Sequence, residues 1–272
     1  MATLSSRLAW LRPPKPTVDG VMTLSDHLRE LRYRVIVSAL AIALGAIASG
    51  IWYQQLYLVM MRPYVLATEM LKQSNPDLNA TTVISGVTAP FMLVMQIAVV
   101  AGLVLSSPIW LYQLWAYIAP ALLAKEKKYA LGFLAAAIPL FLFGVVVGYY
   151  ILPQGISVLL AFTPSSVTNL LDINDFLKLT LQLMVVFGLG FLMPVVIVGA
   201  NLMGVVTAKQ LARARTYVIF GIFVFGAVAT PSSDPFSMLA LAIPMTVLYL
   251  VAEVICHIND RRKAGRTAEV ET

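Results

Sequence analysis

Charge is scarce in this chain of 272 residues: only 12% of them are charged, whereas 60% are hydrophobic. A soluble domain usually carries about 25% charged residues, and a single soluble core would not hide so much apolar surface. The charged residues are also clustered, which leaves long charge-free tracts and a mean hydropathy of +0.85. We therefore expect a protein that crosses a membrane several times.

Cysteine and histidine are almost missing as well. The one cysteine, Cys256, permits no internal disulfide and is expected to be a small packing residue. The two histidines, His27 and His257, both lie at the ends of apolar tracts. No zinc-like or nucleotide-binding spacing is present, so we expect no metal, no cofactor and no nucleic-acid partner.

No ionisable residue falls near the centre of any expected span, and this absence weighs against several classes of membrane protein. An ion-coupled carrier or an insertase needs a buried charge, and an intramembrane protease needs a catalytic pair or a metal motif at depth. A substrate carrier and a membrane-protein insertase remain the alternative functions. The polar residues at depth are instead expected to form interhelical hydrogen bonds: Gln96, Gln113, Gln182 and Asn201.

The apolar tracts predict an all-α bundle of six transmembrane helices, kinked by prolines and enclosing a concave surface. The expected spans are residues 35–52, 90–118, 129–152, 177–203, 216–230 and 236–252. They form one membrane domain over residues 23–258, between a mobile cytoplasmic tail at 1–22 and a second cytoplasmic tail at 259–272. Residues 53–89 are too polar to span, so we expect an extramembrane cap with short helices there.

Loop charge decides how the charge-free tract 78–124 crosses the membrane, because it could hold one long span or two short ones bent at residues 106–108. One span places sixteen of the 19 Lys and Arg residues on one side and three on the other, whereas two spans give twelve and seven. Lys and Arg concentrate on the cytoplasmic side. We therefore expect one long span, with both termini in the cytoplasm.

The last two expected spans are short. The fifth, residues 216–230, would rise about 22 Å as a helix, against a hydrocarbon core of roughly 30 Å. Two interpretations stay open: the flanking residues extend both helices, or the bilayer thins and the helices lie against partner proteins.

Two acids stand out among the basic residues of the expected cytoplasmic face. Glu30 lies in HLRELRYR, residues 27–34, and Glu126 is the one acid of AKEKK, residues 124–128. An i,i+4 salt bridge to Arg34, worth about 0.2–0.5 kcal/mol, would account for Glu30. A basic cluster that only sets membrane topology needs no acid, so the presence of Glu126 is not explained by topology. We expect neither carboxylate to face the apolar core.

Three stretches, in this order, resemble TatC, the multispan core subunit of the twin-arginine translocase: HLRELRYR, QLWAYIAPALLAKEKK and TPSSDPFSMLALAIPM. The resemblance covers roughly residues 22–258 with the same six-span spacing. It implies a receptor, not an enzyme, that binds the twin-arginine signal peptides of folded proteins. It further implies assembly with single-span TatA- and TatB-type subunits and with further copies of itself. Export across the bacterial cytoplasmic membrane would then be driven by the proton-motive force.

The resemblance also implies roles for single residues. Signal-peptide binding corresponds to Glu30, Arg32 and Glu126. The structural or loop positions are Pro63, Pro108, Pro120 and Asp234, and the partner-docking positions are Thr230 and Met238. Because a guanidinium forks onto a carboxylate with two parallel bonds, the two glutamates are expected to prefer arginine over lysine.

Two positions depart from the family pattern. Leu192 stands before Met193 and Pro194 where many relatives have Glu or Gln, so the polar group of the fourth span is missing. Met238 stands where relatives often have Gln, so partner docking is expected to be more apolar in this chain.

Overall fold

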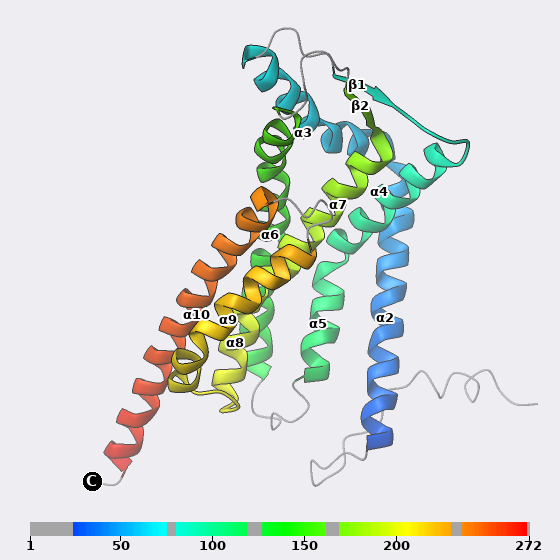
Figure 1. Ribbon diagram of the computed structural model, residues 1–272. Helices are drawn as coiled ribbons and strands as arrows, with labels where there is room; N and C mark the ends of the chain where they lie inside the picture. Colours follow the sequence, from blue (N-terminus) through cyan, green and yellow to red (C-terminus); the bar gives the residue numbers. More distant parts are fainter. Residues whose placement is uncertain (1–23, 75–79, 119–126, 162–168, 230–234, 271–272) are drawn as a thin grey trace, which may run out of the picture.

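The computed structural model describes residues 24–74, 80–118, 127–161, 169–229 and 235–270, and most of these are helical (Figure 1). Within them, five helical segments are long and apolar enough to cross a membrane. A sixth crossing results when the bent pair α4 (Ala89–Leu105) and α5 (Ser107–Ile118) counts as one span. The expected all-α fold with six crossings is confirmed at this level.

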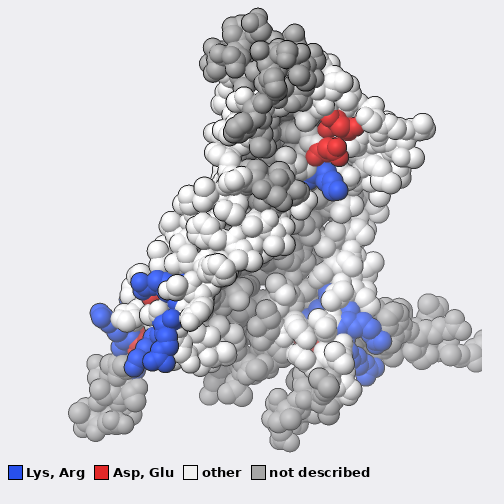
Figure 2. Space-filling model, in the orientation of Figure 1, with Lys and Arg blue, Asp and Glu red and all other residues white. Residues whose placement is uncertain are grey.

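The bundle has two chemically different ends. The lower end in Figure 1 holds the start of helix α2 (Leu24–Ile51), the start of α6 (Lys127–Ala161) and the end of α10 (Pro235–Val270). We call it the basal end. Helix α3 (Tyr53–Ser74) and the strands lie at the opposite end, which we call the outer end. The basal end collects the basic side chains of α2, α9 and α10 (Figure 2).

The expected second span is not one straight helix, because α4 and α5 are bent by 60° at Ser106. Pro108 stands in the first turn of α5, where its missing N–H is tolerated but would interrupt a continuous helix. The carbonyl oxygen of Leu103, beside the break, accepts hydrogen bonds from Trp110 Nε1 at 2.9 Å and from Ser106 Oγ at 3.4 Å. Side chains thus pair the backbone that the bend exposes.

The fourth expected span is also interrupted, at residues 191–192 between α7 (Ile173–Gly190) and α8 (Met193–Leu202). The turn keeps its backbone paired: Phe191 N–H donates to Phe187 O at 2.9 Å, and Leu192 N–H donates to Leu189 O at 3.1 Å. The two helices together still form one membrane-length segment, Ile173–Leu202. Leu192 itself is buried in the hydrophobic core.

The outer cap differs from the expected set of short helices. Helix α3 is a single helix of 22 residues with Pro63 buried inside it. Strand β1 (Ala80–Val83) then pairs in parallel with β2 (Asn169–Asp172). The sequence did not predict this two-stranded ribbon, because strands of four residues are too short to show alternation.

Asp172 connects the ribbon to the first turn of α7. Its Oδ1 accepts from Asn174 N–H at 2.8 Å, which caps the helix, and its Oδ2 accepts from Ser85 N–H at 3.2 Å. The hydrogen bonds from Ser85, followed by those from Asn174, hold the pKa of the Asp172 carboxyl below its usual range. Both strand ends are therefore fixed to the outer end of α7.

The last two helices are longer than expected. Helix α9 (Ala208–Ala229) has 22 residues and α10 has 36, because flanking polar residues at the basal end are helical too. Of the two interpretations left open by the sequence, helix extension is correct. A length mismatch with the bilayer therefore gives no support to partner docking at this hairpin.

Helices α2 and α4 cross in backbone contact at two glycines. A Cβ atom on Gly102 would lie 2.3 Å from Ala46 N, and one on Gly45 would lie 2.7 Å from Gly102 O. Neither atom can move away without separating the helices, because both belong to backbone. The crossing thus requires glycine on both sides, as small-residue contacts between membrane helices do.

We expect Gly102→Ala to destabilise the protein by about 1–3 kcal/mol, the usual cost of overpacking a well-packed contact. The measurement is thermal unfolding of the purified chain in detergent. Gly221→Ala on α9 is the matched control, because no described atom lies within 4 Å of a Cβ added there. Equal unfolding temperatures for the two variants would show that α2 and α4 do not pack as closely as described.

Candidate functional site

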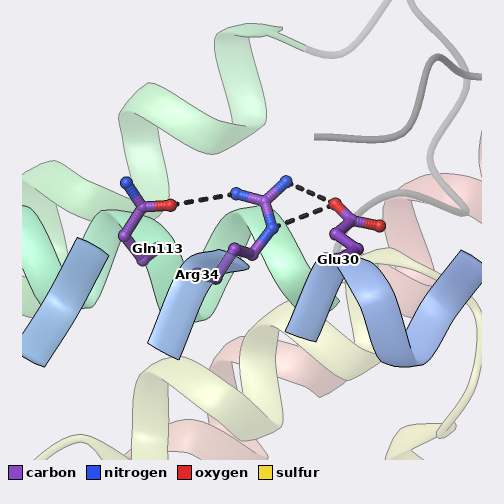
Figure 3. Close-up of polar contacts among 3 residues, drawn as sticks. All are labelled: Glu30, Arg34 and Gln113. Atoms are coloured by element: carbon purple, nitrogen blue, oxygen red, sulfur yellow. Dashed lines mark hydrogen bonds and ion pairs between the residues drawn. The ribbon is translucent and has the colours of Figure 1, made fainter. Parts of the chain in front are cut away.

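Glu30 on α2 is the acid at the centre of the basal site (Figure 3). Arg34, one turn later, donates from Nε to Glu30 Oε1 at 2.9 Å and from Nη2 to the same oxygen at 2.5 Å. Its third nitrogen, Nη1, donates to Gln113 Oε1 on α5 at 3.2 Å. The i,i+4 salt bridge considered from the sequence is therefore present, and it also connects α2 with α5.

A second contact between α2 and α5 lies one helical turn closer to the basal end. His27 stacks on Tyr117, with ring centroids 4.6 Å apart and planes inclined by 18°. His27 and Glu30 are three residues apart and Arg34 four further on, so all three lie on one face of α2. This face packs against α5 and positions Glu30 beside the end of α5, from which the segment containing Glu126 continues.

The burial of Glu30 contradicts the expectation that this carboxylate avoids the core. Glu30 is only 5% exposed. A buried carboxylate is normally paired or hydrogen-bonded, and Arg34 provides the partner. Gln113 was expected to make an interhelical hydrogen bond, and its contact with Arg34 confirms that expectation.

The two oxygens of the Glu30 carboxylate have different environments. Oε1 accepts both bonds from Arg34, whereas Oε2 is buried and has no hydrogen-bond partner among the described residues. A carboxylate oxygen in this position keeps its capacity to accept a hydrogen bond. The site thus presents one bound and one unbound oxygen at the basal end.

Two other acids at the basal end, one buried and one half-buried, use both of their oxygens. Glu253 on α10 accepts from Arg215 on α9 at Oε1 (2.6 Å) and at Oε2 (3.1 Å). Asp260 on α10 accepts from Asn201 Nδ2 at 2.9 Å and from Ala208 N–H at 2.8 Å. These bonds hold α10 to α8 and α9, and they account for both carboxylates structurally.

The sequence predicted only part of the hydrogen bonding around Glu253 and Asp260. Asn201 was expected to form an interhelical hydrogen bond, and its bonds to Asp260 and to Asn259 confirm this. The pairing of Arg215 with Glu253 was missed, because the residues are 38 positions apart and no periodicity connects two helices. Their position at the same end of adjacent spans was the one available signal.

The remaining expected site residues are placed as follows. Arg32 is exposed on α2, Pro108 is exposed in the first turn of α5, and Met238 is half-buried on α10. Met238 lies where α10 crosses α9, since its carbonyl oxygen is 3.2 Å from a Cβ built on Gly226. Four positions lie outside the described residues: Pro120, Glu126, Thr230 and Asp234.

Comparison with known proteins identifies the family. Residues 26–244 match the family described as Sec-independent protein translocase protein (TatC). The TatC protein of Frankia casuarinae is 38% identical over 94% of this chain and 71% of its own length, and that of Aquifex aeolicus is 35% identical over 89% and 98%. The crystal structure of a twin arginine translocase receptor TatC in DDM superposes with a TM-score of 0.72 at 32% identity, over 85% of this chain and 99% of that one. This chain therefore belongs to the TatC family and is a multi-pass membrane component of the Sec-independent protein translocase, a transport system and not an enzyme.

Proposed function

We propose that this chain is the receptor subunit that binds twin-arginine signal peptides at its basal end. The observation that carries the proposal is the Glu30 carboxylate, which is buried, fixed by Arg34 and unbound at one oxygen among the described residues. Glu253 and Asp260 have both oxygens bonded, so they offer no equivalent acceptor. The solved relative named as a twin arginine translocase receptor supports the same assignment.

An arginine side chain suits this acceptor better than a lysine. A guanidinium carries five N–H donors in a planar fork, so it can bond Oε2 of Glu30 while Arg34 keeps Oε1. The ammonium of lysine is a compact, strongly hydrated charge without that geometry. Charge-assisted hydrogen bonds contribute roughly 1.5–3 kcal/mol each, and the burial of Glu30 limits the screening that weakens exposed pairs.

Glu126 is proposed to receive the second arginine of the signal. It precedes Lys127, the first residue of α6, which begins at the basal end. Among the described residues, Glu30 has one unbonded oxygen for one guanidinium, so a second arginine requires a second acid. Two separate carboxylates therefore match two adjacent arginines, while the surrounding basic residues repel cationic peptides in general.

The basal end is proposed to face the cytoplasm of a bacterial cell, with the chain in the cytoplasmic membrane. Lys and Arg side chains gather at that end, over the start of α2 and the basal parts of α9 and α10 (Figure 2). The outer start of α7 instead carries Asp172 and Asp175 beside Lys178. This asymmetry follows the positive-inside rule and would place both termini inside.

We expect reporter fusions after Lys128 and after Ala161, the two ends of α6, to report opposite sides of the membrane. The fusion after Lys128 should be cytoplasmic and the fusion after Ala161 should be external. Paired alkaline phosphatase and fluorescent-protein reporters measure both sides in one strain. The same side for both fusions would contradict the arrangement of six crossings.

We expect Glu126→Gln to weaken binding of a twin-arginine peptide by about tenfold to a hundredfold, the equivalent of one lost charge-assisted contact. Glu30→Gln should weaken binding too, and it should also lower the unfolding temperature because Arg34 loses its buried partner. Affinity is measured with a labelled signal peptide and the full chain in nanodiscs. Each measurement is repeated with a twin-lysine peptide.

Glu69→Gln is the matched control for these variants, because Glu69 is an exposed acid on α3 at the outer end. It should change neither affinity nor unfolding temperature. If Glu30→Gln and Glu126→Gln both bind the twin-arginine peptide as tightly as the unchanged chain, the acids serve only their local ion pairs and the receptor proposal fails.

The outer halves of α9 and α10 are proposed to dock single-span TatA- or TatB-type subunits, in a translocase that contains several copies of this chain and uses the proton-motive force. Helix α9 presents an exposed apolar stripe that would suit such a helix: Tyr217, Phe220, Val224 and Val228. In the chain, Thr230 follows the last residue of α9, and Met238 on α10 lies against Gly226 of α9. Because Met238 replaces a glutamine of many relatives, packing would contribute more here than hydrogen bonding.

We expect Met238→Cys to form a crosslink to the single-span partner in native membranes. Leu142→Cys on the lipid-facing side of α6 is the control and should crosslink weakly or not at all. Crosslinking is read as a mass shift on a gel that depends on co-expression of the partner. A stronger partner crosslink at position 142 than at 238 would place the docking surface on the third crossing instead.

A further inference from the structure

A cavity of about 390 Å³ lies between α6, α8 and α10 in the basal half of the bundle, away from Glu30. Its volume is in the range of ligand-binding pockets. The wall runs from Leu140 and Leu248 at its deep end to Met203 and Ile255 near the basal end. The two α10 positions are seven residues apart, which corresponds to about 10 Å of helix.

The cavity opens toward the hydrocarbon of the membrane. Three of its wall residues are themselves substantially exposed on the lipid-facing surface: Leu202, Val251 and Ile255. Glycine widens the opening at residue 132, where no described atom lies within 4 Å of an added Cβ. The space is thus accessible from the bilayer side, and its wall offers mainly aliphatic side chains.

Trp115 on α5 adds an aromatic side chain to the wall. Trp115 is 5% exposed and stacks on Phe133, with ring centroids 4.0 Å apart. Its indole N–H is buried and makes no hydrogen bond to any residue that the structure describes. The rings of Trp115 and Phe133 thus form an apolar part of the wall, which suits a hydrocarbon occupant.

Positive charge lies directly beyond the basal rim. Arg262 follows Ile255 by seven residues, so it lies on the same face of α10, two turns nearer the basal end. Lys263 donates to the carbonyl oxygens of Asn201 and Leu202 at 3.3 Å each, which fixes its ammonium group at the end of α8. Figure 2 shows basic side chains gathered over this part of the surface.

The acidic side chains near this rim are already hydrogen-bonded within the protein. Between residues 208 and 263, α9 and α10 hold six Lys and Arg residues and two acids. Both acids, Glu253 and Asp260, accept hydrogen bonds at each of their oxygens within the protein. The rim therefore keeps an excess of positive charge toward the membrane surface.

We propose that this cavity is a binding site for one anionic phospholipid. One acyl chain occupies the apolar space, and the phosphate lies against Arg262 and Lys263. The depth of the two parts matches a lipid in the basal leaflet, because phosphate follows hydrocarbon toward the membrane surface. The bound lipid would join α6 to α10 across the end of α8.

The test uses the full-length chain and native mass spectrometry, with phosphatidylglycerol and phosphatidylcholine of identical acyl chains as probes. We expect retention of one phosphatidylglycerol and much weaker retention of phosphatidylcholine. Arg262→Gln should lower phosphatidylglycerol retention about fivefold, from the attraction of a single basic residue to anionic lipid. Equal retention of both lipids would overturn the proposal.

Two matched pairs of variants test the cavity itself. Gly132→Phe should fill it and abolish retention, whereas Gly221→Phe, at another open glycine, should leave retention unchanged. Val251→Trp on the wall should act like Gly132→Phe, and Val247→Trp, one turn away outside the wall, should not. Thermal unfolding shows which variants remain folded. The proposal is wrong if a folded cavity-filling variant retains phosphatidylglycerol as well as its control.

Discussion

The interior of a bilayer offers no hydrogen-bond partner to a broken helix, and this constraint determines where the chain can bend. It bends at Ser106 and at residues 191–192, and in both cases a proline follows two residues later. At the first break, Trp110 and Ser106 donate to the carbonyl of Leu103. At the second, the backbone closes on itself in a tighter turn. Both interruptions are therefore compatible with a bilayer, because each pairs its own backbone.

The same constraint applies to charge, and the acids at the basal end meet it in different ways. Glu253 and Asp260 satisfy every oxygen inside the protein, so they act as fixed connections between helices. Glu30 is buried as well, yet only one of its oxygens is bonded among the described residues. Its unbonded oxygen is what distinguishes it from the two acids of α10, and the proposed receptor role depends on that difference.

Sequence patterns predicted what depends on neighbouring residues and missed what depends on distant ones. Apolar tracts gave the crossings, and the motif around Glu30 pointed to the basal site. The burial of Glu30 could not be predicted, because it depends on the packing of α2 against α5, where Arg34 donates to Gln113, 79 residues further along the chain. The lengths of α9 and α10 were underestimated, because polar residues such as Arg215 continue a helix beyond its apolar part. The role of Glu126 stays a prediction.

The parallel ribbon at the outer end has a consequence for the order in which the protein assembles. Strand β1 is synthesised long before β2, and α4, α5 and α6 all lie between them in the chain. A parallel pair needs such a crossover connection, and here the crossover is itself threaded through the membrane. The backbone N–H and C=O groups of β1 find their partners only when Asn169–Asp172 has been synthesised. The ribbon can therefore form only after α6 has been inserted. A completed ribbon thus marks a chain whose first half has already reached its place in the bilayer, and it joins that half to the start of α7.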